Sequence, residues 1–188
     1  MAKIRTNNEL LRIMDKYVLF MDSKKQAEMP LVVSQIKQNH PSSLYKEVSI
    51  KSESSFGCVT MDCEIRNKDH NNYSIQLVSD MIKNKVLSRL DEGNGTHRNA
   101  LSTIPLQEQM VSTPHFHIYT KNGHFLAYQT ENLKSYNEKP MPIEVGIHEF
   151  CQEMNIHSTD EHPIDVIVQE EGVLALDFGI DPLEGIKF

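Results

Sequence analysis

The chain lacks the features that mark several large protein classes. Its 188 residues include only three cysteines, Cys58, Cys63 and Cys151, and none has CxxC spacing. An odd set of this kind favours small buried residues in a reducing compartment over disulfides or a zinc finger. No 18 apolar residues run together, and the N-terminal stretch has no uninterrupted apolar segment, so we expect neither a spanning helix nor a secretion signal. These absences predict a cytoplasmic protein that does not enter a membrane.

The chain also lacks an excess of basic residues. It has 19 Lys and Arg against 26 Asp and Glu, a formal net charge of −7. This balance argues against broad, charge-driven binding to nucleic acid, although a local basic cleft is compatible with it. With 39% hydrophobic residues, a chain of this length can bury a real core and is expected to form a single domain, 1–188.

An amphipathic helix is expected to open the chain, within a helical N-terminal part at 1–43. Thr6 is placed as its N-cap, with Glu9 three residues later, which is the spacing of a capping box. Apolar residues then recur at helical spacing and predict a stripe that covers a sheet. These residues are Leu10, Met14, Tyr17, Val18 and Met21. Residues 22–40 show no steady pattern and are left unassigned.

A sheet core with a closing helix is expected at 44–156. The stretch FGCVTMDCEIRN alternates apolar and polar residues, as a half-buried strand does, and NYSIQLVSDMI and KVLSRL continue the pattern after polar breaks. Residues 91–113 show no steady period and are predicted to be a long ordered loop. Pro142 marks the first turn of the closing helix and Asn155 its end.

The overall prediction is therefore an α+β fold. It consists of a twisted antiparallel meander of about five to seven strands, with an N-terminal and a C-terminal helix packed on it. A C-terminal extension at 157–188 is expected to hold a strand at 164–169, which VLALDF pairs with as a hairpin.

The stretch STPHFHIYTKNGHFLAYQ is the most informative part of the sequence. Read as a two-residue turn, Asn122-Gly123 places His117 opposite Tyr128 and Tyr119 opposite Leu126. Phe116, Ile118, Phe125 and Ala127 then share one face. The other face carries polar and titratable groups, which are either simply solvated or chemically active: His115, His117, Tyr119, Lys121, His124 and Tyr128.

A second motif, His97-Arg98-Asn99, precedes this hairpin. If the loop folds back, it reaches the start of the same strand. Arginine binds phosphate or carboxylate, histidine moves protons near neutral pH, and tyrosine donates a hydrogen bond, so the set predicts a metal-free site for a phosphoester, either a nucleotide or RNA. The expected catalytic residues are His97, His115, His117 and Tyr119, and the expected ligand-binding residues are Arg98, Asn99, Lys121 and His124.

A metal site is the rival interpretation of the same residues. His115 and His117 project from one strand face and supply two ligands, which His124, His97 or Asp91 would complete. The sequence lacks the nearby downstream acid of a cupin-like pattern, and Tyr119 stands where a histidine-triad nucleotide hydrolase has its third histidine. The sequence therefore favours a site without a metal or other cofactor.

Several motifs together resemble a domain family of unknown function found in bacterial and phage proteins. They are Arg89-Leu90-Asp91, His97-Arg98-Asn99, Ile104-Pro105, Pro114-His115-Phe116-His117-Ile118-Tyr119 and, after the closing helix, Met154-Asn155-Ile156. The resemblance covers residues 45–156. It implies that the HRN and PHFH motifs belong to one unit, and it implies a phage or mobile-element setting.

That setting brings a second class of function into view. Small acidic proteins of mobile elements often act as inhibitors of host defence, such as a CRISPR-type effector, or as antitoxins. In this alternative the acidic surface binds a protein partner, and the HRN and PHFH residues only brace the loop. The histidine grouping favours chemistry, whereas the charge of −7 favours binding.

Overall fold

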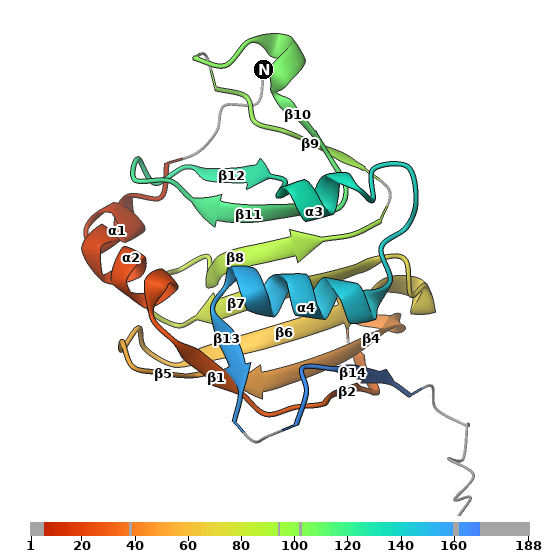
Figure 1. The fold of residues 1–188 in the computed structure, drawn as a ribbon. Coiled ribbons are helices and arrows are strands. Elements are labelled where there is room, and N and C mark those ends of the chain that lie inside the picture. The colour runs from red at the N-terminus through yellow and green to blue at the C-terminus, as the bar shows by residue number, and fades with distance from the viewer. Residues whose placement is uncertain (1–5, 38, 94, 102, 160–161, 170–188) are drawn as a thin grey trace, which may run out of the picture.

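The computed structural model describes residues 6–37, 39–93, 95–101, 103–159 and 162–169. A seven-stranded antiparallel sheet forms its centre, with strand order β12-β11-β8-β7-β6-β4-β3 (Figure 1). The predicted α+β fold is thereby confirmed. The strands, in chain order, are β3 (Gln35–Lys37), β4 (His40–Ser49), β6 (Val59–Ile65), β7 (Tyr73–Ser79), β8 (Val86–Asp91), β11 (His115–Tyr119) and β12 (Phe125–Tyr128).

Shorter strands extend this arrangement at its margins. β1 (Lys25–Ala27) lies between β5 (Lys51–Ser52) and β13 (Ile156–Ser158), and β2 (Leu31–Val33) pairs in parallel with β14 (Val166–Val168). The strand expected at 164–169 is thus present, but its expected hairpin partner lies outside the described residues. The segment at 22–37 is built of short strands, so the N-terminal part is only partly helical.

The helices are short, and α4 covers one face of the sheet (Figure 1). They are α1 (Asn8–Leu11), α2 (Met14–Asp22), α3 (Glu131–Lys134) and α4 (Ile143–Glu153), with 3₁₀ turns η1 (Arg66–Lys68) and η2 (Leu106–Glu108). None of these described helices has the length and apolar character needed to cross a bilayer. Asn155 has a φ of 53° just after α4, so the predicted helix end is confirmed.

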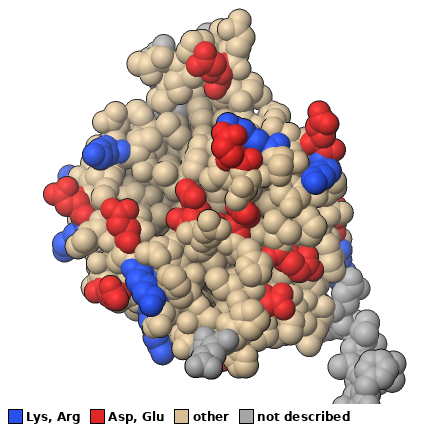
Figure 2. Space-filling view, viewed as in Figure 1, with Lys and Arg blue, Asp and Glu red and all other residues tan. Residues whose placement is uncertain are grey.

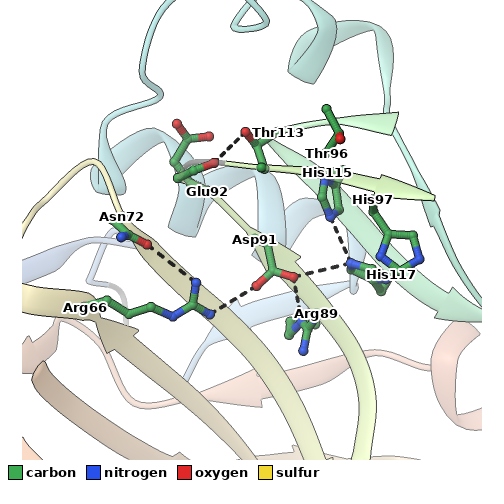
Figure 3. Close-up of a pocket in the computed structure, with 12 residues that line it drawn as sticks. Arg66, Asn72, Arg89, Asp91, Glu92, Thr96, His97, Thr113, His115 and His117 are labelled. Carbon is green, nitrogen blue, oxygen red and sulfur yellow. Dashed lines mark hydrogen bonds and ion pairs between the residues drawn. The ribbon is translucent and has the colours of Figure 1, made fainter. Parts of the chain in front are cut away.

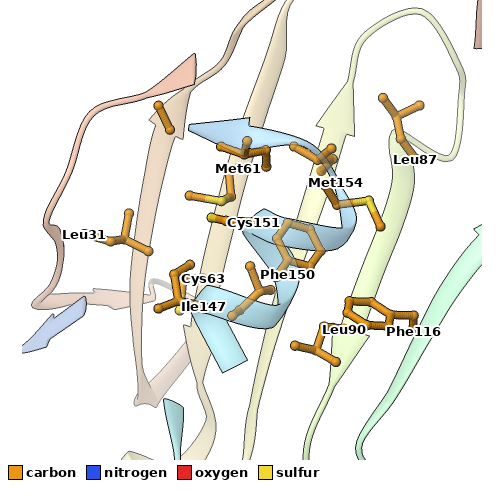
Figure 4. Close-up of a cluster of buried hydrophobic side chains, with 14 of the residues drawn as sticks. Leu31, Met61, Cys63, Leu87, Leu90, Phe116, Ile147, Phe150, Cys151 and Met154 are labelled. Atoms are coloured by element: carbon orange, nitrogen blue, oxygen red, sulfur yellow. The ribbon is translucent and has the colours of Figure 1, made fainter. Parts of the chain in front are cut away.

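The core lies between α4 and the sheet. Ile147, Phe150 and Cys151 of α4 point toward Cys63, Leu90 and Phe116 of the strands (Figure 4). Phe116 and Phe150 stack with ring centroids 6.4 Å apart. The apolar residues predicted to alternate along β6 are buried here, because every second side chain of a strand faces the same side.

Charged side chains are scattered over the molecular surface on the side where α4 lies (Figure 2). Asp and Glu side chains lie there separated by neutral residues, with Lys and Arg mostly toward the margins, so the described part of this face has no continuous acidic patch (Figure 2).

Two predictions near the N-terminus and in the loop at 91–113 are wrong. The helix is capped by Asn7, whose side chain accepts from the Leu10 N–H at 3.0 Å, and not by Thr6. It also breaks into α1 and α2. The segment at 91–113 is not a loop throughout, since β9 (Thr96–Arg98) and β10 (Met110–Ser112) pair as an antiparallel ribbon. This β9–β10 ribbon projects from the sheet beyond β12 (Figure 1).

The register of the β11–β12 hairpin also differs from the prediction by one residue. Its turn has three residues, 121–123, because the Thr120 N–H donates to the His124 carbonyl at 2.9 Å and Gly123 adopts a φ of +71°. His117 therefore lies opposite Ala127, and Tyr119 opposite Phe125. A shift of one residue reverses the faces of a strand, so Phe125 joins the histidine face.

Candidate functional site

Two neighbouring strands place charged and titratable side chains on one face of the sheet. His115 pairs with Asp91 and His117 with Arg89 across β11 and β8. Leu90, between the two charged residues of β8, points into the core beneath α4 (Figure 4). Because side chains alternate along a strand, Arg89, Asp91, His115 and His117 share the opposite face.

A third histidine reaches this face from the β9–β10 ribbon. The ring of His97 lies edge-on to that of His117, with centroids 4.6 Å apart, and its centroid is 5.9 Å from that of His115. One nitrogen from each of the three rings lies within 4.8 Å of the others. We call His97, His115 and His117 the three-histidine cluster (Figure 3).

Hydrogen bonds set the proton positions in the buried part of this cluster. Nδ1 of His115 lies 3.0 Å from the Ser112 carbonyl, which only accepts, so Nδ1 carries the proton and Nε2 has a free lone pair. That Nε2 lies 2.9 Å from Nε2 of His117. The His117 proton therefore sits on Nε2, which also lies 3.3 Å from Oδ2 of Asp91. These tautomers follow from the hydrogen-bond network.

The environment keeps all three imidazoles neutral. Burial is the main cause, and it lowers the pKa of each of the three histidines. The neighbouring imidazole lowers the pKa of His97 and His115 further, whereas the hydrogen bond to Asp91 opposes the shift at His117. Phe125 stacks on the His117 ring with centroids 5.2 Å apart and excludes water from that side. Neutral imidazoles have lone pairs available for a proton or a metal ion.

Asp91 is an ionised carboxylate between two arginines. Arg89 Nε lies 2.7 Å from Oδ2 as an ion pair without hydrogen-bond geometry, and Arg66 Nη2 lies 3.4 Å from Oδ1. Burial raises the pKa of Asp91, but the His117 hydrogen bond and the two guanidinium charges outweigh burial and hold this pKa below its usual range. One negative and two positive charges leave the group with a local excess of one positive charge.

These side chains line a cavity of about 250 Å³ (Figure 3). It is smaller than the roughly 300 Å³ at the lower end for drug-sized ligands, so it fits a small group. Besides the cluster, Asp91 and the two arginines, the lining residues are Asn72, Glu92, Gly93, Gly95, Thr96 and Thr113.

The HRN motif is split between the cavity and the protein interior. His97 lines the cavity, as expected, but Arg98 is not among the lining residues. Arg98 Nε donates to Gln109 Oε1 at 3.0 Å within the β9–β10 ribbon. Asn99 is buried, and its side chain makes two hydrogen bonds to the Ala127 backbone, of 2.7 and 2.9 Å. Asn99 therefore braces the ribbon against β12, whereas Arg98 links β9 to the residue just before β10.

Three other residues expected at the site lie outside the cavity lining. The Tyr119 hydroxyl accepts from Asn7 Nδ2 at 3.3 Å, and its ring packs edge-on against Tyr17 of α2. His124 Nε2 lies 3.2 Å from Thr6 Oγ1. Lys121 is exposed in the turn. Tyr119 and His124 thus hold the N-terminal helices to the hairpin.

Arg66 and Arg89 are the site residues that the sequence interpretation missed. Arg89 could have been predicted, because the alternation in VLSRLD places it on the same strand face as Asp91. Arg66 follows β6 in η1, where no periodicity indicates where its side chain points.

A scan against protein-family models and searches of curated proteins and of solved structures each found no match.

Proposed function

We propose that the protein binds a small phosphoester in this cavity and hydrolyses it. The observation that carries the proposal is that two arginines share the cavity with three neutral imidazoles. Glu92 also lines the cavity, and burial raises its pKa to about 7, so below that pH the cavity keeps a positive excess, which selects an anion in a chain of net charge −7. Guanidinium groups bind phosphate through paired hydrogen bonds, and imidazoles act on water near neutral pH.

The roles follow from the contacts. Arg66 and Arg89 bind phosphate oxygens, and Asp91 holds both guanidinium groups and His117 in place. The three-histidine cluster activates water, either by accepting its proton or through a bound metal ion. The water oxygen attacks phosphorus, the bond from phosphorus to the leaving oxygen breaks, and the proton lost by the water passes through an imidazole to that oxygen.

Turnover by the untagged full chain tests the proposal. The substrates are p-nitrophenyl phosphate, bis-p-nitrophenyl phosphate and a panel of nucleotides, which separate monoester from diester activity. Loss of a donor to the transition-state charge costs on the order of 100-fold in kcat, so Arg89→Gln and Arg66→Gln should each lose activity to about this degree. Circular dichroism verifies that both variants fold.

Arg98→Gln is the matched control, since Arg98 bonds to Gln109 away from the cavity. It should keep wild-type activity. The proposal fails if no phosphoester is turned over, or if Arg89→Gln and Arg98→Gln have the same effect.

The inhibitor alternative rests on an acidic surface for a partner protein. On the α4 face the Asp and Glu side chains are separated by neutral residues, so this face gives the inhibitor alternative no particular support (Figure 2). The bracing contacts of Arg98 and Asn99 are compatible with both functions, whereas the cavity with its imidazoles favours chemistry.

A further inference from the structure

We propose that His97, His115 and His117 together bind one divalent transition-metal ion of the Zn²⁺ class. The inference depends on the proposed function only for the ion's catalytic role. It reverses the expectation of a metal-free site, because His97 of the β9–β10 ribbon supplies the third imidazole that the strand lacks at Tyr119. The ring nitrogens that the fold brings within 4.8 Å of one another are separated by up to 20 residues in sequence.

The distances suit such an ion. Zinc binds imidazole nitrogen at about 2.0–2.1 Å, which places tetrahedral ligand atoms about 3.3 Å apart. Nε2 of His115 and Nε2 of His117 are already 2.9 Å apart. His97 is half-buried and lies on a ribbon with three-residue strands, so its ring has the freedom to close the remaining distance.

The surroundings of the histidines also suit a metal centre. A metal-binding imidazole usually donates its second N–H to a carbonyl or carboxylate, which aims the other nitrogen at the ion. His115 does this with the Ser112 carbonyl at 3.0 Å, and its Nε2 points into the cluster. The ion would displace the proton on His117 Nε2, and a neutral His117 would then carry its proton on Nδ1, which is buried without a partner among the described residues.

Three histidines leave a fourth position for water, as in catalytic zinc sites. A bound zinc lowers the pKa of that water toward neutrality. Asp91 Oδ2 lies 3.3 Å from His117 Nε2; once this nitrogen gives up its proton to bind the ion, the carboxylate is able to accept a hydrogen bond from that water. Arg66 and Arg89, which pair with Asp91, flank the same cavity and place an anion beside the water.

Cobalt binding to the full chain without a histidine tag is the direct test. The protein is treated with EDTA, the chelator is removed, and CoCl₂ is titrated while the visible absorption of tetrahedral Co²⁺ is followed. Calorimetry with ZnCl₂ gives stoichiometry and affinity. We expect one ion per chain. Cys58 is exposed, so the titrations use a Cys58→Ser background to remove a competing thiolate.

His97→Ala is the main variant, because His97 is the least buried of the three and lies outside the central sheet. It should weaken Zn²⁺ affinity at least about tenfold, the smallest loss usual even for residues that only support a metal ligand. His117→Ala should do the same, with circular dichroism as a check of folding. His124→Ala is the matched control and should bind as the wild type does, since His124 contacts Thr6.

The inference is overturned if neither ion binds, or if His97→Ala and His117→Ala bind as tightly as His124→Ala does. Metal binding without phosphoester turnover would sustain this inference and reject the proposed function. If the protein binds no ion but still turns over a phosphoester in EDTA, the proposed function stands and the metal inference is rejected.

Discussion

Glu92, the residue after β8, should make the protein less stable as pH rises. Its side chain is only 6% exposed; Oε1 accepts a long hydrogen bond from the Met141 N–H at 3.4 Å, and Oε2 is buried without a partner among the described residues. Burial raises the pKa of Glu92 from 4.5 to about 7. The folded protein therefore prefers the protonated carboxyl group.

The sign and size of the effect follow from this shift. A carboxyl group whose pKa is raised on folding contributes stability that is complete below its unfolded pKa of 4.5, and that is lost as pH rises to the folded value of about 7. At about 1.4 kcal/mol per pKa unit, the full shift from 4.5 to about 7 corresponds to about 3–4 kcal/mol. Glu92→Gln keeps the shape and the acceptor oxygen but never ionises.

Urea unfolding followed by circular dichroism between about pH 4 and pH 8 measures the difference. The Glu92→Gln protein should match the wild type at the acid end and exceed it by about 3–4 kcal/mol at the alkaline end, where the shift is fully expressed. Glu108→Gln, at an exposed position on η2, is the control and should follow the wild type throughout. A Glu92→Gln curve parallel to that of the wild type would refute the reasoning.

Three further substitutions test the packing and the bracing. Gly146→Ala places a Cβ against the Tyr73 hydroxyl and 2.7 Å from its ring carbons, so overpacking of about 1–3 kcal/mol should outweigh the gain of about 1 kcal/mol in helix propensity; thermal melting should show a lower Tm, and a higher one would contradict the clash. Lys25→Met should lower the free energy of unfolding by about 2–4 kcal/mol in urea, because the buried ammonium donates to the carbonyls of Met21, Ser23 and Met154 at 2.8–2.9 Å; an unchanged midpoint would show that these carbonyls find other donors. Asn99→Ala removes both side-chain bonds to Ala127 and should expose the β9–β10 ribbon to limited proteolysis, whereas cleavage at the wild-type rate would mean that other contacts hold it.

Long periodic segments could be predicted from the sequence, and short ones could not. The alternation along β6 and the helical spacing of α4 repeat often enough to identify each element and its buried face. β9 and β10 have three residues each, too few for a period to be recognised. In the hairpin, one extra turn residue moved Phe125 to the histidine face, because register depends on turn geometry as well as on the hydrophobic pattern.

The site could be predicted only where its residues share a strand. His115 and His117 are two residues apart, so strand alternation alone places them together. The approach of His97 depends on how the ribbon folds back, which no local pattern encodes. The residue type of Arg98 suggested anion binding, but its Nε donates a hydrogen bond to Gln109, the residue just before β10.

The two buried histidines belong to the central sheet, whereas His97 belongs to a ribbon of two short strands. Local opening of such a peripheral unit costs much less free energy than global unfolding. Each opening would separate His97 from His115 and His117. Any ion held by all three rings would add its binding energy to the closed form. The amide protons of Thr96–Arg98 should then exchange with solvent more slowly in the presence of Zn²⁺. The exchange rate of the ribbon would therefore report whether the site holds an ion.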